Sequence, residues 1–175
     1  FKSHAQQADV SIGLRINPEC STVETALYNP CMPGSRLGIV ADQLPLLPQG
    51  VEGLHVHALC EQGAEDLQTL VKSVEDKFGH LLHQVKWLNL GGGHHITKKG
   101  YNLPLLTSLL LHLKKTYDVQ VYLEPGEAIG WETGVLTARV EDIVEANGIQ
   151  TALLNVSFTA HMPDCLEMPY KPAVR

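Results

Sequence analysis

The sequence predicts an α/β fold with parallel strands, followed by a shorter β-rich part. Four runs rich in Val, Ile and Leu alternate with stretches that have the apolar spacing of helices. After Trp131 the pattern changes to strands joined by an Asn147-Gly148 turn, which is typical of a hairpin. We therefore expect a boundary near residues 128–135, dividing the chain into residues 1–130 and 131–175.

The predicted strands are short apolar runs, and this composition is typical of strands that are buried on both faces of a sheet. They are "VSIGLRI" at 10–16, "GLHVHAL" at 53–59, "VKWLNL" at 85–90 and "VQVYL" at 119–123. Strands that alternate with helices belong to parallel βα units. We expect these four to be consecutive and parallel, each followed by a helix except the last.

Two predicted helices separate the later strands. Residues 63–84 carry apolar side chains at helical spacing, and Gly79 could end this helix. The spaced residues are Leu67, Leu70, Val71, Val74 and Phe78. Residues 103–117 repeat the pattern, with Pro104 near the start and two lysines in the last turn.

Composition narrows the class of protein. The chain has 175 residues, 44% apolar and 18% charged, as in a globular domain. It contains no basic run for nucleic acid and no apolar stretch of roughly 18 residues for a membrane. The net charge of -6 permits a cationic substrate. The four cysteines lack metal-site spacing, so we expect reduced thiols and a cytoplasmic protein.

The residues that could bind a ligand or take part in catalysis lie where the predicted strands end. This is the edge at which α/β sheets and barrels bind ligands. The four groups, in chain order, are Arg15 and Asn17; His55, His57, Cys60 and Glu61; Gly91, Gly92, Gly93, His94 and His95; and Glu124 and Glu127.

Three glycines follow the third predicted strand directly. Without Cβ atoms, Gly91, Gly92 and Gly93 can bring their N–H groups close to an anion and form a nest for phosphate. A sharp turn is the alternative explanation. The loop is not a Walker motif, because no Gly-Lys-Ser/Thr follows it.

His55 and His57 are expected on one face of a strand, because strand side chains alternate with period two. Such a pair could bind a metal together with carboxylates, or one ring could lie flat against a cofactor. Each could also be an ordinary buried, hydrogen-bonded histidine. Further along, residues 159–170 place His161, Asp164 and Glu167 in a predicted loop, which either faces a ligand or partner or is simply solvated.

Six stretches in this order resemble the carboxynorspermidine (carboxyspermidine) decarboxylase family. They are "GLRINPE", "LYNPCMPGSRLGI", "GLHVHALCE", "LNLGGGHH", "LEPGEAIGW" and "TAHMPDCLEMPY". The family belongs to the pyridoxal-phosphate decarboxylases of the alanine-racemase-like fold. The resemblance covers about residues 10 to 172.

The resemblance implies the C-terminal part of a pyridoxal-phosphate-binding (β/α)8 TIM barrel in residues 1–130. The start of a C-terminal β domain would follow in residues 131–175. It also implies decarboxylation of carboxynorspermidine or carboxyspermidine to norspermidine or spermidine, in a cytoplasmic homodimer. A small polyamine-like substrate is the expected partner, with neither nucleic acid nor membrane.

The same resemblance implies roles for individual residues. Glu124 would pair with the pyridine nitrogen and His57 would stack on the ring, which makes these two the expected catalytic residues. Arg15 would lie near the cofactor, and Gly91, Gly92 and Gly93 would hold its phosphate. Glu127 and Asp164 would take the amino groups of the substrate. No metal is implied.

The chain also departs from the family. A full barrel takes about 250 residues. The lysine that binds the cofactor would lie upstream, and a Cys-containing segment would lie downstream. We therefore expect an interior segment that is inactive alone. Glu127 stands where related decarboxylases carry Arg after "EPG", and Asn155 where Asp is common.

Two other functions compete with the decarboxylase. One is a metal-dependent barrel hydrolase with His55, His57, His94 and an acid as ligands. The other is a non-catalytic module that binds pyridoxal phosphate. The motif order favours the decarboxylase, and small modules of the second kind lack a β domain.

Overall fold

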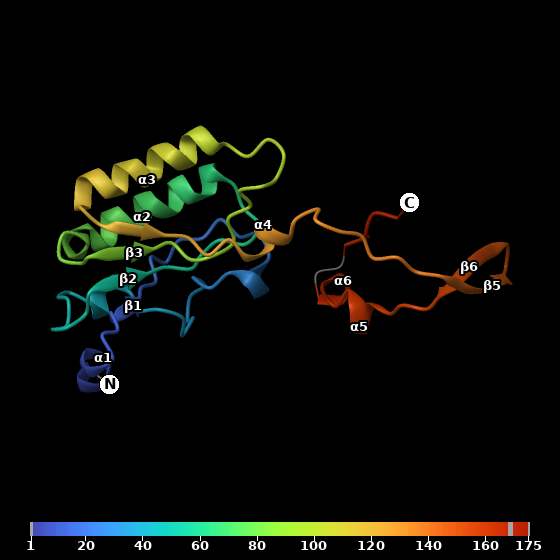
Figure 1. Ribbon diagram of the computed structural model, residues 1–175, viewed down its shortest axis with the longest axis horizontal. Helices are drawn as coiled ribbons and strands as arrows, with labels where there is room; N and C mark the ends of the chain where they lie inside the picture. The colour runs from blue at the N-terminus through green and yellow to red at the C-terminus, as the bar shows by residue number, and fades with distance from the viewer. Residues whose placement is uncertain (1, 168–169, 175) are drawn as a thin grey trace. The chain divides into compact units, whose positions relative to one another are not determined.

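The computed structural model describes residues 2–167 and 170–174. The chain divides between Trp131 and Glu132 into two compact units, each of which is described by itself. Figure 1 follows the elements of both units along the chain.

The first unit is built on a four-stranded parallel sheet in the order β1-β2-β3-β4. Its strands are β1 (Gly13–Arg15), β2 (Gly53–His55), β3 (Trp87–Asn89) and β4 (Gln120–Tyr122). The prediction of an α/β fold with four consecutive parallel strands is confirmed. The strands are shorter than the apolar runs, although single backbone bonds such as Val56 N–H to Asn89 O continue past them. Closure of this sheet into a barrel stays a prediction.

Two long helices, α2 (Ala64–Leu82) and α3 (Leu103–Tyr117), lie over one face of the sheet (Figure 1). The apolar positions of α2 form one core with the strand residues Leu54 and Leu88, both fully buried. The prediction that Gly79 ends this helix is wrong. The helix continues to Leu82 because Leu81 and Leu82 add buried apolar surface beyond the glycine.

The connections after β1 and β4 also differ from the prediction. Between β1 and β2, a segment that the structure describes throughout, the chain forms two short 3₁₀ turns in place of an α-helix, η1 (Ala26–Tyr28) and η2 (Ala41–Gln43). Residues 17–52 contain five prolines, which remove helical N–H donors. A short helix, α4 (Gly126–Gly130), does follow β4 and begins directly after Pro125. The φ of −77° at Pro125 suits a helix start.

The other face of the sheet carries Trp87, whose indole lies across its neighbours. A Cβ atom on Gly13 or Gly53 would collide with that ring. The indole Nε1 donates to Ser11 Oγ at 2.8 Å, and the ring meets Tyr122 edge to face. The two glycines therefore make room for one large side chain on this face.

The second unit contains the predicted hairpin. Strands β5 (Val140–Ala146) and β6 (Ile149–Leu154) are antiparallel. Asn147 and Gly148 join them with φ of 53° and 76°, the left-handed values that a tight hairpin turn needs. The hairpin is confirmed; its place as the start of a β domain stays a prediction.

Short helices replace part of the loop predicted at 159–170. They are α5 (Phe158–His161) and α6 (Asp164–Glu167). Ser157 caps α5 by accepting a hydrogen bond from Ala160 N–H, and Pro163 precedes α6 directly. Met168 and Pro169 of the same stretch lie outside the described residues.

One short helix precedes the sheet, α1 (Lys2–Gln7). Among the helices that the structure describes, none has the length and apolar character needed to cross a membrane. All four cysteines are free thiols.

Candidate functional site

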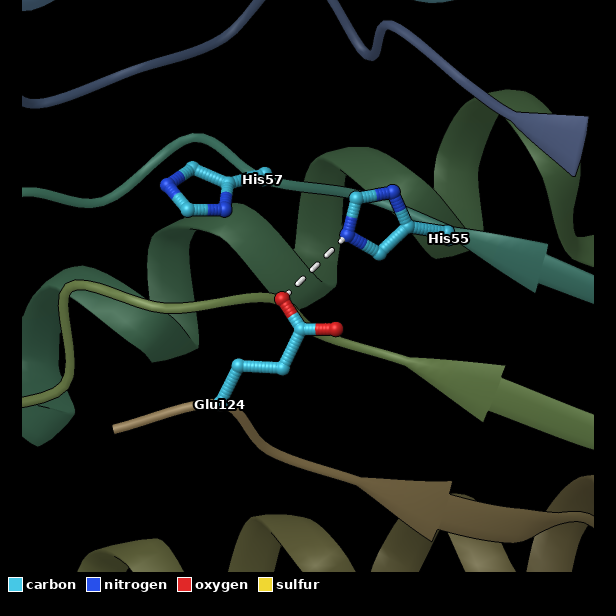
Figure 2. A group of neighbouring side chains, drawn as sticks. All are labelled: His55, His57 and Glu124. Atoms are coloured by element: carbon cyan, nitrogen blue, oxygen red, sulfur yellow. Dashed lines mark ion pairs between the residues drawn. The ribbon is translucent and has the colours of Figure 1, made fainter. Parts of the chain in front are cut away.

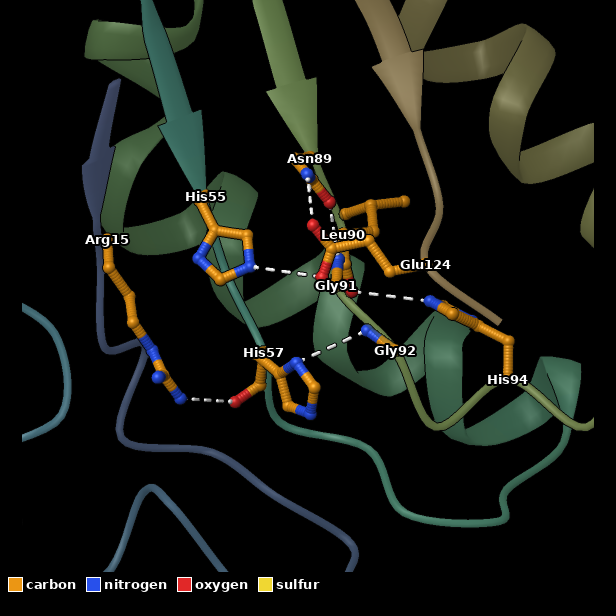
Figure 3. Close-up of polar contacts among 9 residues, drawn as sticks. All are labelled: Arg15, His55, His57, Asn89, Leu90, Gly91, Gly92, His94 and Glu124. Atoms are coloured by element: carbon orange, nitrogen blue, oxygen red, sulfur yellow. Dashed lines mark hydrogen bonds and ion pairs between the residues drawn. The ribbon is translucent and has the colours of Figure 1, made fainter. Parts of the chain in front are cut away.

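The parallel register brings the residues at the strand ends onto one face. Arg15, His55, Asn89 and Tyr122 pair in a single row across the four strands. Two residues past each paired position, just beyond the strand ends, stand Asn17, His57, Gly91 and Glu124. Figure 3 shows most of this group at the ends of the strands, on the face that α2 and α3 do not cover.

Asn89 holds Glu124 and the glycine loop together (Figure 3). Its Nδ2 donates to Glu124 Oε1 at 2.8 Å, and its Oδ1 accepts from Gly91 N–H at 2.8 Å. The second carboxylate oxygen, Oε2, lies 3.8 Å from His55 Nε2. Sequence reasoning missed Asn89. Its place two residues before Gly91 in a strand was the available signal.

His57 is half-buried and forms hydrogen bonds with Gly92 and Arg15. Its Nδ1 accepts from Gly92 N–H at 3.3 Å, and its backbone carbonyl accepts from Arg15 Nη2 at 3.2 Å. Burial lowers the pKa of His57, and the Arg15 guanidinium lowers it further. Burial also lowers the pKa of His55, against the opposing pull of Glu124. Both rings are therefore neutral at neutral pH.

The three glycines pack closely against their surroundings. Gly91 and Gly93 have φ of 69° and 82°, which side chains disfavour. A Cβ on Gly91 would lie 2.5 Å from Val56 O, and one on Gly93 would collide with Leu59 O. The N–H groups of Gly91 and Gly92 are bonded within the protein. That of Gly93 has no partner among the described residues.

A pocket lies beside the glycine loop. It is lined by Glu61, Gly93, His94, His95, Gly126, Glu127 and Ala128. His95 is only 3% exposed, and its Nε2 lies 3.7 Å from Glu127 Oε1. Trp131 packs against the same ring at 4.5 Å between centroids. Sequence reasoning placed His95 and Glu61 at a strand end without a role.

The same face also offers a group that could bind a metal (Figure 2). Ligand atoms of His55, His57 and Glu124 all lie within 4.8 Å of one another. His94, the fourth residue of the metal alternative, is not in this group. Its Nε2 lies 3.3 Å from Leu90 O, inside the loop.

The two acids expected to bind substrate are in different units. Glu127 stands on α4, whereas Asp164 stands on α6 of the second unit. Their proximity therefore stays a prediction.

Two known proteins are similar to almost the whole chain. The carboxynorspermidine/carboxyspermidine decarboxylase of Campylobacter jejuni is 50% identical over 175 residues, covering 99% of this chain and 45% of that protein. The carboxyaminopropylagmatine decarboxylase of Synechocystis is 46% identical over 177 residues, covering 100% of this chain and 46% of that protein. This chain thus spans less than half the length of either relative. No family model matches the chain.

Solved structures agree with these relatives. The crystal structure of carboxynorspermidine decarboxylase from Campylobacter jejuni, complexed with norspermidine, superposes with a TM-score of 0.83 at 46% identity. It aligns with 97% of this chain and 43% of that chain. A diaminopimelate decarboxylase superposes with a TM-score of 0.71 at 17% identity, over 94% of this chain and 44% of the other, which shows likeness of fold alone.

Proposed function

Because this chain belongs to the carboxynorspermidine decarboxylase family of pyridoxal-phosphate-dependent decarboxylases, we propose that it carries cofactor-binding residues of such an enzyme. The proposed reaction converts carboxynorspermidine or carboxyspermidine to norspermidine or spermidine with release of carbon dioxide. The 50% identity to a relative of that name, over 99% of this chain, is the strongest support.

The described residues fit pyridoxal phosphate at one place in particular. A Cβ on Gly92 would lie 2.8 Å from the backbone carbonyl oxygen of Glu124 and 3.2 Å from His57 Cε1. Glycine therefore lets the loop lie close to both residues, whose carboxylate and imidazole atoms come within 4.8 Å of one another. A carboxylate suits a protonated ring nitrogen, and a flat imidazole suits a ring face. This arrangement of His57, Gly92 and Glu124 carries the proposal.

Bound there, pyridoxal phosphate would supply an electron sink for the electron pair that remains when carbon dioxide leaves. Glu124 would hold a proton at the pyridine nitrogen. Asn89 keeps that carboxylate oriented through the 2.8 Å bond to Oε1. His57 would support the ring, while Gly92 N–H fixes the imidazole through Nδ1. Arg15 holds the His57 backbone through its carbonyl oxygen.

We propose that Asp164 binds a substrate amino group, because a carboxylated triamine offers several cations for carboxylates. Glu127 is the other candidate, although its carboxylate already faces His95. We further propose a cytoplasmic homodimer as the active form. No lysine is among the site residues described above, so we expect these 175 residues to bind cofactor without turnover.

Carboxyaminopropylagmatine is a second candidate substrate. The relative named for it matches 100% of this chain at 46% identity, close to the value for the first relative. An agmatine derivative ends in a guanidinium group, which pairs with carboxylates through two parallel hydrogen bonds.

A graft tests the function directly. The matching 175 residues of the Campylobacter jejuni relative are replaced by this chain, and carbon dioxide release is measured from all three carboxylated substrates. We expect turnover of at least one, dependent on pyridoxal phosphate. A folded graft without cofactor absorbance would contradict the proposal. Bound metal with activity that needs it would support the hydrolase instead.

A further inference from the structure

Two histidines and a carboxylate at the strand ends form a set of metal ligands. Ligand atoms of His55, His57 and Glu124 all lie within 4.8 Å of one another, and Figure 2 shows the carboxylate pointing towards both rings. The ring centroids are 6.3 Å apart and the rings are tilted by 57°, so they do not stack on each other. Two imidazoles and one carboxylate are a combination that binds zinc in proteins.

The spacing of these ligands is close to what one ion requires. Two ligands bound at 2.0–2.2 Å to a tetrahedral ion stand about 3.4 Å apart. Glu124 Oε2 lies 3.8 Å from His55 Nε2, so this pair needs only a small rotation to share an ion. The other carboxylate oxygen, Oε1, accepts from Asn89 Nδ2, and such bonds orient carboxylates that bind metals.

The remaining ligand, His57, must give up one weak hydrogen bond. Its Nδ1 accepts from Gly92 N–H at 3.3 Å, which is longer than the usual 2.7–3.2 Å. A metal on Nδ1 replaces this bond, and a metal on Nε2 leaves the ring proton on Nδ1, where it faces the same N–H. Zinc binding through either nitrogen therefore releases Gly92 N–H.

We propose that His55, His57 and Glu124 bind one zinc ion when no cofactor is bound. The inference goes beyond the proposed function, in which His57 and Glu124 contact the cofactor ring and His55 has no role. The side chains of His55 and Glu124 are 24% and 52% exposed, so an ion reaches them from solvent and water completes its coordination. Because zinc and pyridoxal phosphate would use the same two residues, the ion excludes the cofactor.

Zinc binding is tested with this chain in a buffer free of phosphate and chelators. Isothermal titration calorimetry gives the number of ions, for which we expect one per chain at this site. His55→Gln and Glu124→Gln should each weaken binding at least about tenfold, since a direct ligand matters no less than a residue that supports one. His80→Gln is the matched control, because His80 is exposed on α2 and lies outside the group.

Two further measurements distinguish this site from zinc bound elsewhere on the surface. The amide signal of Gly92 in a nuclear magnetic resonance spectrum should shift as zinc is added. In equilibrium dialysis, zinc should weaken the binding of pyridoxal phosphate to the parent chain, as expected for two ligands of one site. In His55→Gln, zinc should leave cofactor binding unchanged, which separates exclusion from the binding of zinc by the cofactor in solution.

Each result decides between defined outcomes. A chain that binds no zinc, or binds it equally well after Glu124→Gln, would overturn the inference. Simultaneous binding of zinc and pyridoxal phosphate would overturn it as well. Because the Glu124 side chain is 52% exposed, Glu124→Gln keeps the test valid even if a histidine variant fails to fold. Zinc binding by a chain that takes up no pyridoxal phosphate would support the metal site and contradict the proposed function.

Discussion

Asn89 makes two short hydrogen bonds at the centre of the candidate site. We expect Asn89→Leu to lower the free energy of unfolding by about 1–3 kcal/mol, because the buried Gly91 N–H would lose its partner. Urea denaturation measures the change. Asn89→Asp keeps an acceptor for Gly91 and should recover part of the loss. A leucine variant as stable as the parent would show that this bond contributes little.

Glu124 gives a second prediction at the same scale. In the grafted decarboxylase, Glu124→Gln keeps the shape of the side chain and removes its charge. We expect a loss in kcat worth at least about 2 kcal/mol, since the carboxylate favours a ring proton needed more in the transition state than in binding. Steady-state kinetics separate kcat from KM. Asp76→Asn, on the exposed side of α2, should change neither; a change in KM alone would contradict the role of Glu124.

Site residues could be predicted from the sequence where the alternation of side chains along a strand indicates their direction. Alternation within a strand placed His55 and His57 on one side, and the 4.8 Å grouping with Glu124 agrees with it. Asn89 was missed because its importance lies in two side-chain bonds whose partners depend on strand register. The contact of His95 with Glu127 could not be predicted. After Leu90 the backbone is irregular, so no periodic pattern indicates which way the His95 side chain points.

At the scale of elements, β2 and β3 pack together because Gly53 on β2 leaves space for the Trp87 indole on β3. Gly53→Ala would drive a methyl group into the Trp87 indole. We expect a loss of about 1–3 kcal/mol in the free energy of unfolding from overpacking. Trp87→Leu in the same chain should reverse part of it, so that the two changes are not additive. Gly134→Ala, with open space around it, is the control. Additive effects would show that the indole does not constrain Gly53.

The helices and strands were predictable where an apolar repeat extends over many residues. Helices α2 and α3 and the 147–148 turn follow from apolar spacing and turn chemistry. The connection between β1 and β2 has no repeating pattern, because its prolines favour turns. The short helices α4, α5 and α6 have four or five residues, too few for an amphipathic repeat to be read.

For the molecule as a whole, three histidines make stability depend on pH. Burial lowers the pKa of His55, His57 and His94 in the folded chain. The unfolded chain takes up these protons near pH 6.5, whereas the folded chain takes them up only at lower pH. The free energy of unfolding should therefore fall as the pH drops below about 6.5. Urea denaturation at pH 7.5, 6.5 and 5.5 measures this, and His94→Gln should flatten the dependence. Constant stability over this range would be inconsistent with neutral buried rings.

The two units should also differ in stability. Every residue of β5 and β6 is exposed, and an isolated two-stranded hairpin is marginal in water. Amide hydrogen exchange should be much faster in these strands than in α2, whose apolar face is buried. Mass spectrometry of peptides from each region measures the difference. Equal protection in both would mean that the hairpin is covered in solution.

The paired rows across the sheet affect which insertions and deletions this molecule tolerates. His57 and Glu124 occupy the same face because each stands two residues past its paired strand position. Deleting one residue between Leu54 and His57 would turn the imidazole towards the helices and bring an apolar neighbour to the site. Added residues in the 3₁₀ turns between β1 and β2 would leave that face unchanged. In natural variants, gaps should therefore collect in residues 18–52 and avoid the few positions directly after each strand.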